Sequence, residues 1–388
     1  MGKAKSIIIY SVIIVLCAVA FGGYLMNRSP KKADAPQAST KTEQQSTSVE
    51  QQNTNTEKKA EETAAKPAEN QVKELDPAQF KSDVERKHVE EIMKKAFEAP
   101  EPNPVVGVGT GTDFEKVTEK AIENAGGLQN IIKKGQVVLI KPNLCYMPEA
   151  GSPLTTDYRV VKKVAELALK HGASKVIIAE GNFSSDAFQP ALLEMSKYDT
   201  IKGVELVNLN SFEKKDCYEL QPKESLVGKA IFVPKVFMDA DVVINVAKLK
   251  THFLTAASMS LKNCIGVPSF KVYPGGGSKD ALHGLGIENV IIDLNRIRKP
   301  EFSVIDGIVG GEGNGPMNNT PVKSNIVLAG KDMVALDTAG LTFMGFKLEE
   351  VNHVKLAADK NMGIADLKSI KINGADINAI KMDFESPF

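Results

Sequence analysis

The run Val242-Val-Ile-Asn-Val246 decides the fold class. Four of its five residues are β-branched, which predicts a strand that is covered on both faces of a sheet. Two similar runs precede it along the chain, Val137-Val-Leu-Ile140 and Val176-Ile-Ile-Ala179, and amphipathic stretches accompany them. This pattern predicts an α/β domain that has a mostly parallel sheet with flanking helices.

Two amphipathic stretches are expected to form helices on this sheet. Thr112-x-x-Glu115 fits a capping box, and the helix that it opens is closed by Gly126-Gly127. The second helix is predicted over residues 158–170 and ends at His171-Gly172. Crossovers of this kind bring the carboxyl ends of the strands to one edge of the sheet, where functional groups gather.

The composition argues against several classes of partner and cofactor. The 388 residues include 48 basic and 48 acidic side chains, so the net charge gives no argument for a nucleic-acid partner. None of the four cysteines stands in a C-x-x-C pair, so neither a zinc ribbon nor an iron–sulfur cluster is indicated. We interpret the cysteines of the domain as small buried apolar residues.

The N-terminal residues predict export across a membrane. Residues 6–26 carry no charge, and at about 1.5 Å per residue they could span a bilayer as a helix. Lys3 and Lys5 precede them, which favours a cytoplasmic N-terminus. We therefore predict a single-pass transmembrane anchor within residues 1–27 and an extracytoplasmic domain at a bacterial-type cell membrane. The alternative is a signal peptide that is cleaved near Ala20, which would give a secreted protein.

A linker and a docking helix are expected between the anchor and the domain. Residues 28–75 are polar and almost free of large apolar side chains, so we predict a disordered linker. Residues 76–99 are predicted as a helix with Asp76 as N-cap and Pro77 at its first position. Its apolar face would dock on the α/β domain of residues 105–388 through six side chains: Phe80, Val84, Val89, Ile92, Met93 and Phe97.

Basic and histidine side chains follow two of the predicted strands. Lys141 and Asn143 follow the first strand, and Lys250, Thr251 and His252 follow the third. Further along the chain stand three more polar candidates: Lys262, Asn263 and His283. Lysine at such an edge can bind an oxyanion, and histidine can transfer a proton or bind a metal ion. For each histidine taken alone, a structural hydrogen-bonding role is the competing interpretation.

Carboxylates and glycines complete the set of candidates. Asp306 and Glu312, the latter within a glycine-rich stretch, could serve as acid/base groups or bind a hard divalent cation, or they could simply form turns. Asp332 is expected to cap a helix. The Gly107-x-Gly109-x-Gly111 pattern lacks the spacing of a dinucleotide site, so we favour a plain glycine-rich turn over a phosphate site.

Taken together, these segments resemble the family called domain of unknown function 362. The motifs that carry the resemblance are Val138-Leu-Ile-Lys-Pro-Asn-Leu144, Lys250-Thr-His252, Lys262-Asn-x-x-Gly266, Asp306-Gly307, Glu312-Gly-x-Gly-Pro316 and Asp332-x-x-Ala-x-Asp337. The resemblance covers about residues 105–374 and implies an α/β fold with a site at the strand ends. Many relatives look redox-associated because they carry a cysteine-rich ferredoxin-like segment. This sequence shows no such segment, so we do not carry over the electron-transfer role.

The favoured hypothesis is an enzyme that acts on a small anionic or polar substrate by acid/base chemistry, with a divalent cation as an optional cofactor. In it, lysines bind the anion, His252 is the general base or acid, and Asp306 or Glu312 is the second proton-transfer group. Asn263 and His283 orient the substrate. The alternative is a non-catalytic module of the cell envelope that captures a ligand or ion at the same place. The identity of any metal is left open.

Overall fold

The computed structural model describes residues 75–144, 150–181, 197–273 and 280–388. The predicted anchor or signal peptide lies outside these residues, and so does the predicted linker except for Leu75. Within the described residues, no helix is both long and apolar enough to cross a membrane.

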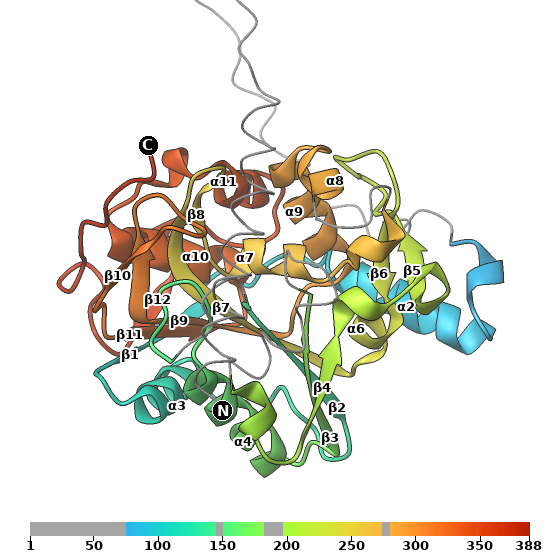
Figure 1. Ribbon diagram of the computed structural model, residues 1–388, viewed down its shortest axis with the longest axis horizontal. Helices are drawn as coiled ribbons and strands as arrows, with labels where there is room; N and C mark the ends of the chain where they lie inside the picture. Colours follow the sequence, from blue (N-terminus) through green and yellow to red (C-terminus); the bar gives the residue numbers. More distant parts are fainter. Residues whose placement is uncertain (1–74, 145–149, 182–196, 274–279) are drawn as a thin grey trace, which may run out of the picture. The chain divides into compact units, whose positions relative to one another are not determined.

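A mostly parallel sheet forms the centre of the domain (Figure 1). Its strands follow the order β12, β1, β11, β9, β7, β2, β3, β4. Strands β9, β7, β2, β3 and β4 run parallel to one another, whereas β11 runs antiparallel to both β9 and β1. The predicted α/β class is therefore confirmed, as a mixed sheet. The bounds are β12 Lys371–Asn373, β1 Val105–Thr110, β11 Ile326–Gly330, β9 Phe302–Glu312, β7 Val242–His252, β2 Val137–Pro142, β3 Lys175–Glu180 and β4 Val204–Asn208.

Helices cover both faces of this sheet. Helices α3 (Phe114–Asn124) and α4 (Tyr158–Lys170) lie on one face, and α7 (Ser260–Asn263), α9 (Ile287–Ile297), α10 (Met333–Met344) and α11 (Asn352–Asp359) lie on the other (Figure 1). Side chains alternate between faces along a strand. In β2, Val138 and Ile140 join the core under α3 and α4, while Leu139 joins the core on the other face.

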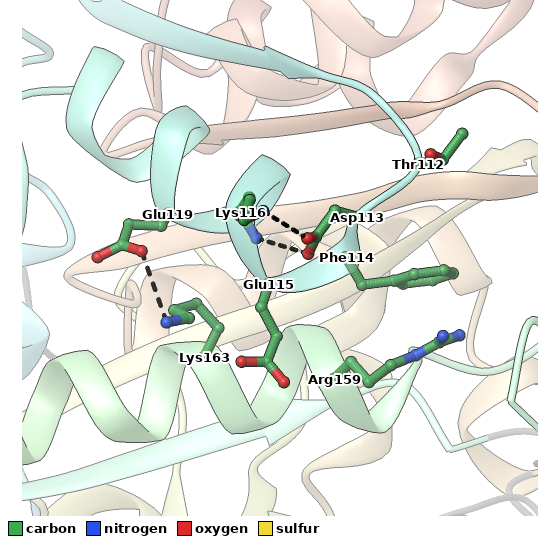
Figure 2. A pocket seen from close by; sticks show the side chains of 8 residues that line it. All are labelled: Thr112, Asp113, Phe114, Glu115, Lys116, Glu119, Arg159 and Lys163. Carbon is green, nitrogen blue, oxygen red and sulfur yellow. Dashed lines mark hydrogen bonds and ion pairs between the residues drawn. The ribbon is translucent and has the colours of Figure 1, made fainter.

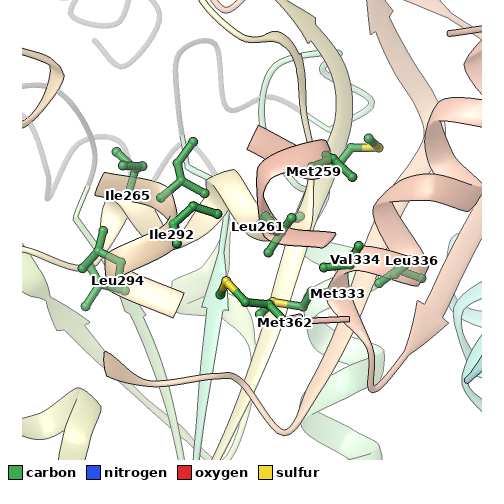
Figure 3. Packing of buried hydrophobic residues seen from close by; sticks show 14 of the residues in the cluster. Met259, Leu261, Ile265, Ile292, Leu294, Met333, Val334, Leu336 and Met362 are labelled. Atoms are coloured by element: carbon green, nitrogen blue, oxygen red, sulfur yellow. The ribbon is translucent and has the colours of Figure 1, made fainter. Parts of the chain in front are cut away.

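The core on the second face fixes the short helix α7. Leu261 of α7 lies among buried side chains from α9 and α10, including Ile292 and Met333, and Met362 lies beside them (Figure 3). The carboxylate of Asp337 accepts hydrogen bonds from the backbone N–H groups of Ser260 and Leu261, at 2.8 and 3.0 Å, and so caps the start of α7. Lys262 is therefore carried by a firmly held element.

Smaller elements surround the main sheet. Strands β5 (Cys217–Leu220) and β6 (Ile231–Pro234) form an antiparallel pair, and α6 (Lys235–Asp239) follows β6. Helix α8 (Asp280–His283) packs against α9. The short 3-10 helices are Pro77–Gln79, Tyr198–Thr200, Leu209–Ser211, Lys214–Asp216, Cys264–Gly266, Phe270–Val272, Leu348–Glu350 and Leu367–Ser369.

Two strands are longer than predicted. Strand β7 continues through Lys250 to His252 and forms a hairpin with β8 (Ala256–Ser258). Strand β9 likewise continues through Asp306 to Glu312, where it pairs with β10 (Thr320–Val322). The glycine-rich stretch that contains Glu312 therefore begins inside a hairpin. The antiparallel partners β8 and β10 form backbone hydrogen bonds with these extensions. The polar side chains in the sequence did not indicate that the two strands continue this far.

The helix starts differ in detail from the prediction. Asp113, not Thr112, caps α3, because its carboxylate accepts the N–H of Lys116 at 3.1 Å. Gly126 ends α3 in a left-handed conformation, and α4 spans the predicted residues with Asp157 as N-cap. Asp332 caps α10 as predicted, accepting the N–H groups of Val334 and Ala335.

The helix predicted over residues 76–99 is divided. Asp76 does cap a first turn, but that turn is a 3-10 helix, and Ser82 caps the separate helix α2 (Asp83–Lys95) because its hydroxyl accepts the N–H of Glu85. Helix α2 packs against α6 and α9. Val89, Ile92 and Met93 are buried in this contact, whereas Val84, predicted on the docking face, is 78% exposed.

The glycines of the Gly107-x-Gly109 pattern serve helix packing. Both lie inside β1, so the predicted glycine-rich turn is wrong. A Cβ atom on Gly107 would stand 2.1 Å from the carbonyl oxygen of Ala121 in α3, and one on Gly109 would stand 2.3 Å from that of Val117. The absence of side chains lets α3 lie directly on the strand.

We expect Gly107→Ala to lower the free energy of unfolding by about 3 kcal/mol, since the backbone of α3 must move to admit the methyl group. Thr110→Ala, at the exposed end of the same strand, is the control and should cost less than about 1 kcal/mol. Chemical denaturation of both variants measures the difference. Equal stability of the two variants would contradict the packing role.

Candidate functional site

Lys141 and Glu180 form a buried ion pair at the ends of neighbouring strands. Their Nζ and Oε2 atoms are 2.6 Å apart, and the side chains are 1% and 3% exposed. Lys141 also donates to the carbonyl oxygen of Pro142 at 3.0 Å and lies 3.4 Å from Oδ1 of Asn263. Lys141 was predicted to bind an anionic substrate, but its ammonium group contacts Glu180, Pro142 and Asn263 of the protein itself. Glu180 was missed, although it ends a predicted strand and the strand-end rule would have found it.

Asn263 connects α7 to the sheet. Its Nδ2 atom donates to Oδ1 of Asn245 at 2.6 Å and to the carbonyl oxygen of Lys141 at 3.2 Å. Asn245 in turn donates to the carbonyl oxygen of Ser260 at 2.8 Å. Asn263, predicted to orient a substrate, therefore orients α7. Gly266 lies so close that a Cβ atom there would be 2.6 Å from Nζ of Lys141.

Lys248 and Asp306 form a second ion pair that is wholly buried. Nζ and Oδ2 are 2.8 Å apart, and both side chains are 0% exposed. The same carboxylate accepts the N–H of Asp157 at 2.9 Å and that of Ile308 at 3.2 Å. A carboxylate that already holds a counterion and two N–H donors has little room for a substrate. Asp306 therefore has a structural role in the ion pair. Its partner Lys248 was not among the predicted site residues.

Lys250 and Asn143 contact each other, as a shared site requires. Nζ of Lys250 donates to Oδ1 of Asn143 at 2.9 Å and to the carbonyl oxygen of Leu154 at 2.7 Å. Thr156 ties the same loop to the sheet, because its hydroxyl donates to the carbonyl oxygen of Val246. The described part of the loop between β2 and α4 is thus fastened over the strand ends.

Thr251 and Glu312 form hydrogen bonds that hold the β9–β10 hairpin in place. The hydroxyl of Thr251 donates to the carbonyl oxygen of Gly313 at 2.6 Å, and Oε2 of Glu312 accepts the N–H of Glu385 at 2.9 Å. Glu312 lies six positions after Asp306 along an extended strand, a span of roughly 20 Å. The two carboxylates that were predicted as alternative proton-transfer groups therefore do not converge.

His252 ends β7 as a buried side chain, 4% exposed. Its Nδ1 atom accepts the backbone N–H of Leu254 at 3.1 Å. Burial, followed by the positive charges of Lys262 and Lys250, holds the pKa of His252 well below its usual range. The ring is therefore neutral at pH 7, and its proton resides on Nε2 because Nδ1 is accepting. This geometry makes His252 a hydrogen-bond donor and disfavours the predicted role as general base.

Three other predicted residues lie within electrostatic range of this ring. Lys250, Lys262 and His283 each contribute to the low pKa of His252, so their charges lie within electrostatic range of it. We call Lys250, His252, Lys262 and His283 the basic cluster. Lys262 and His283 are half-buried, which leaves the cluster partly open to solvent. Across the described residues, no group of three His, Cys, Asp or Glu side chains could hold a metal ion.

One histidine of this region was missed by sequence reasoning. His353 of α11 also lowers the pKa of His252, and it is itself 0% exposed. In the sequence it stands within an amphipathic stretch, where a core residue is the ordinary expectation. Burial, with the charge of Lys262 as a second cause, lowers the pKa of His353 to about 3.

A hollow of about 640 Å³ lies between the first turns of α3 and α4 (Figure 2). Opposite charges that line it neutralise each other, since Asp113 pairs with Lys116 at 3.4 Å and Glu119 with Lys163 at 3.5 Å. Arg159 is held by Asp157 at 2.8 Å. None of the basic cluster lines this hollow, so it does not mark the predicted site.

Residues 138–342 match the family described as Domain of unknown function (DUF362), and this range is more than half of the chain. The chain belongs to this family. The matched range contains the whole basic cluster and both buried ion pairs, whereas His353 lies beyond it. In this DUF362 protein, the motifs around Lys141 and Lys250 lie at strand ends, and the motif that begins at Lys262 lies in helix α7.

Two individual proteins resemble the chain. It is 27% identical over 252 residues to "Thylakoid-associated protein sll1697" of Synechocystis sp., an alignment that covers 63% of this chain and 73% of the relative. A crystal structure of a protein from Thermotoga maritima aligns with a TM-score of 0.33 and 15% identity, over 55% of this chain. The chain spans 54% of the length of that protein.

We expect Lys248→Met to lower the free energy of unfolding by about 3–5 kcal/mol, because it leaves the Asp306 carboxylate buried without its counterion. Adding Asp306→Asn should recover part of this loss, since a neutral amide oxygen still accepts the N–H of Asp157. Denaturant unfolding measures both variants.

Lys116→Met is the matched control, because its ion pair with Asp113 is exposed and such pairs contribute little. A Lys248→Met protein as stable as this control would show that Asp306 does not depend on Lys248. Asp306 would then return as a candidate proton-transfer group.

Proposed function

We propose that the domain is an enzyme that binds a small oxyanion at the basic cluster and stabilises negative charge on it. The observation that carries this proposal is the buried ring of His252, which accepts the N–H of Leu254 at Nδ1 and has two lysines and a second histidine within electrostatic range. The elements involved, β7, α7 and α8, follow one another within residues 242–283, and the buried network of Lys141 and Asn263 holds α7 in place.

The chemistry that suits this arrangement is charge stabilisation. A lysine binds an oxyanion as a point charge. A neutral imidazole N–H in a water-poor setting can stabilise an oxyanion as it develops, without giving up its proton beforehand. His252 has this form, because Nδ1 accepts the N–H of Leu254 and Nε2 carries the proton. The proposal keeps the anionic substrate of the sequence-based hypothesis and replaces its general base by a donor. It does not depend on a divalent cation.

A second candidate function is capture of the anion without turnover. It is favoured by the setting of Asp306, whose carboxylate is committed to Lys248 and two backbone N–H groups. Glu312 is held by the N–H of Glu385. Because both predicted carboxylates already have partners, neither is open for proton transfer. A non-catalytic binding module of the cell envelope does not require such a group, whereas an acid/base enzyme does.

The proposed place of action is the outer side of a membrane. The uncharged residues 6–26 support an anchor, and the relative from Synechocystis sp. is named for its association with thylakoids. Both lines of support are independent of the basic cluster.

We expect the full-length protein to bind inorganic phosphate or citrate, measured by titration calorimetry, and Lys262→Ala to weaken the binding at least tenfold. A lost charge–charge contact of this kind typically costs about 1.5–3 kcal/mol. Lys331→Ala, which removes an exposed lysine outside the cluster, is the control and should bind as the wild type does. Wild-type protein that binds neither anion would overturn the oxyanion site.

Turnover separates the two candidate functions. An enzyme should convert some member of a panel of phosphate esters and carboxylate esters, followed by NMR, and His252→Phe should abolish that conversion. A capturing module should return every bound compound unchanged. Retained conversion in His252→Phe would exclude the ring as the stabilising donor.

We further expect the full chain, expressed in a bacterium, to sediment with membranes and to be digested by protease added outside the inner membrane. Deletion of residues 1–27 should leave the protein in the cytoplasmic fraction. Full-length protein that stays in the cytoplasmic fraction would contradict the proposed anchor.

A further inference from the structure

His353 has an unusual environment for a buried polar side chain. It is 0% exposed, and neither Nδ1 nor Nε2 has a hydrogen-bond partner. A buried polar group left without a partner typically costs about 1–3 kcal/mol. Such a cost calls for an explanation, because a leucine at this position would fill the space without it.

His353 lies near Lys262, a member of the basic cluster. Helix α11, which carries His353, packs against α7, which carries Lys262, and the positive charge of Lys262 acts on the His353 ring. In Figure 1, α9 lies between α8 and α11, and it contacts both helices. Lys262 itself is half-buried.

The start of α11 adds a third attractive feature. His353 is the second residue of this eight-residue helix, and side chains in a first turn lean toward the helix N-terminus. Val351 occupies the N-cap position, where its apolar side chain cannot accept the N–H groups of the first turn. The N–H of Val354 already donates to the carbonyl oxygen of Val351 at 3.1 Å, so the donors for a ligand are the N–H groups of Asn352 and His353. A helix N-terminus attracts phosphate through such donors and the helix dipole.

We propose that a phosphoryl group binds at the N-terminus of α11, between the ring of His353 and the ammonium group of Lys262. This inference rests on the proposed oxyanion site and names both its substrate class and a further binding residue. The neutral ring donates one N–H to a phosphoryl oxygen, and Lys262 supplies the positive charge. A compact anion with several oxygens can use the ring, the ammonium group and the backbone N–H groups together, which a carboxylate does less well.

The test uses the full-length protein and inorganic phosphate, with acetate as the comparison anion. His353→Leu should bind phosphate at least tenfold more weakly in calorimetry, while its melting temperature stays equal to or above that of the wild type. The stability follows because leucine removes the unpartnered nitrogens. His353→Gln restores an N–H donor and should recover part of the affinity, which a merely structural role would not predict.

The outcomes separate this inference from the proposed function. Phosphate binding as tight in His353→Leu as in the wild type, together with loss in Lys262→Ala, would overturn the role of His353 and leave the oxyanion site standing. Binding of acetate in preference to phosphate would overturn the phosphoryl assignment alone. A wild-type protein that binds neither anion would overturn both. If His353→Leu fails to fold, His353→Met takes its place, because it also lacks an N–H donor; phosphate affinity of His353→Met equal to that of Lys331→Ala would overturn the inference.

Discussion

The structure depends on one constraint: positive charges that enter the sheet must be paired inside it. Lys141 and Lys248 project from neighbouring strands into regions without water, where an unpaired ammonium group would cost several kcal/mol. Glu180 and Asp306 meet this requirement at 2.6 and 2.8 Å. Because each pair joins two adjacent parallel strands, the pairs also fix where the strand ends stand relative to each other.

The loops and helices around the site inherit their positions from these pairs. Asp306 receives the N–H of Asp157, the residue that caps α4, so the pair with Lys248 also fixes the start of that helix. Lys141 donates from Nζ to Oδ1 of Asn263, and its carbonyl oxygen accepts the Nδ2 group of Asn263. Asn263 in turn fixes the position of α7, which carries Lys262. The structural lysines thus hold the elements from which Lys250 and Lys262 act on His252.

The strands and helices of the parallel half could be predicted because their signals are local. The β-branched runs identified β2, β3 and β7, and a glycine closed α3 where expected. The ends of β7 and β9 could not be predicted, since polar residues there stay extended only through the distant partners β8 and β10. The same holds for the site: the strand-end rule found Lys141 and Lys250, but the partners that distinguish their roles lie 39 and 107 residues away.

Residue type alone therefore does not distinguish the settings of the buried lysines in this chain. Lys248 and Lys250 are two positions apart on one strand and equally buried, yet one faces a carboxylate and the other an amide and a carbonyl oxygen. A lysine paired with a carboxylate has its charge neutralised where it stands. The charges of Lys250 and Lys262 lower the pKa of His252, after burial, so both lysines lie within electrostatic range of its ring. The proposed oxyanion site rests on this grouping of basic side chains around a buried histidine.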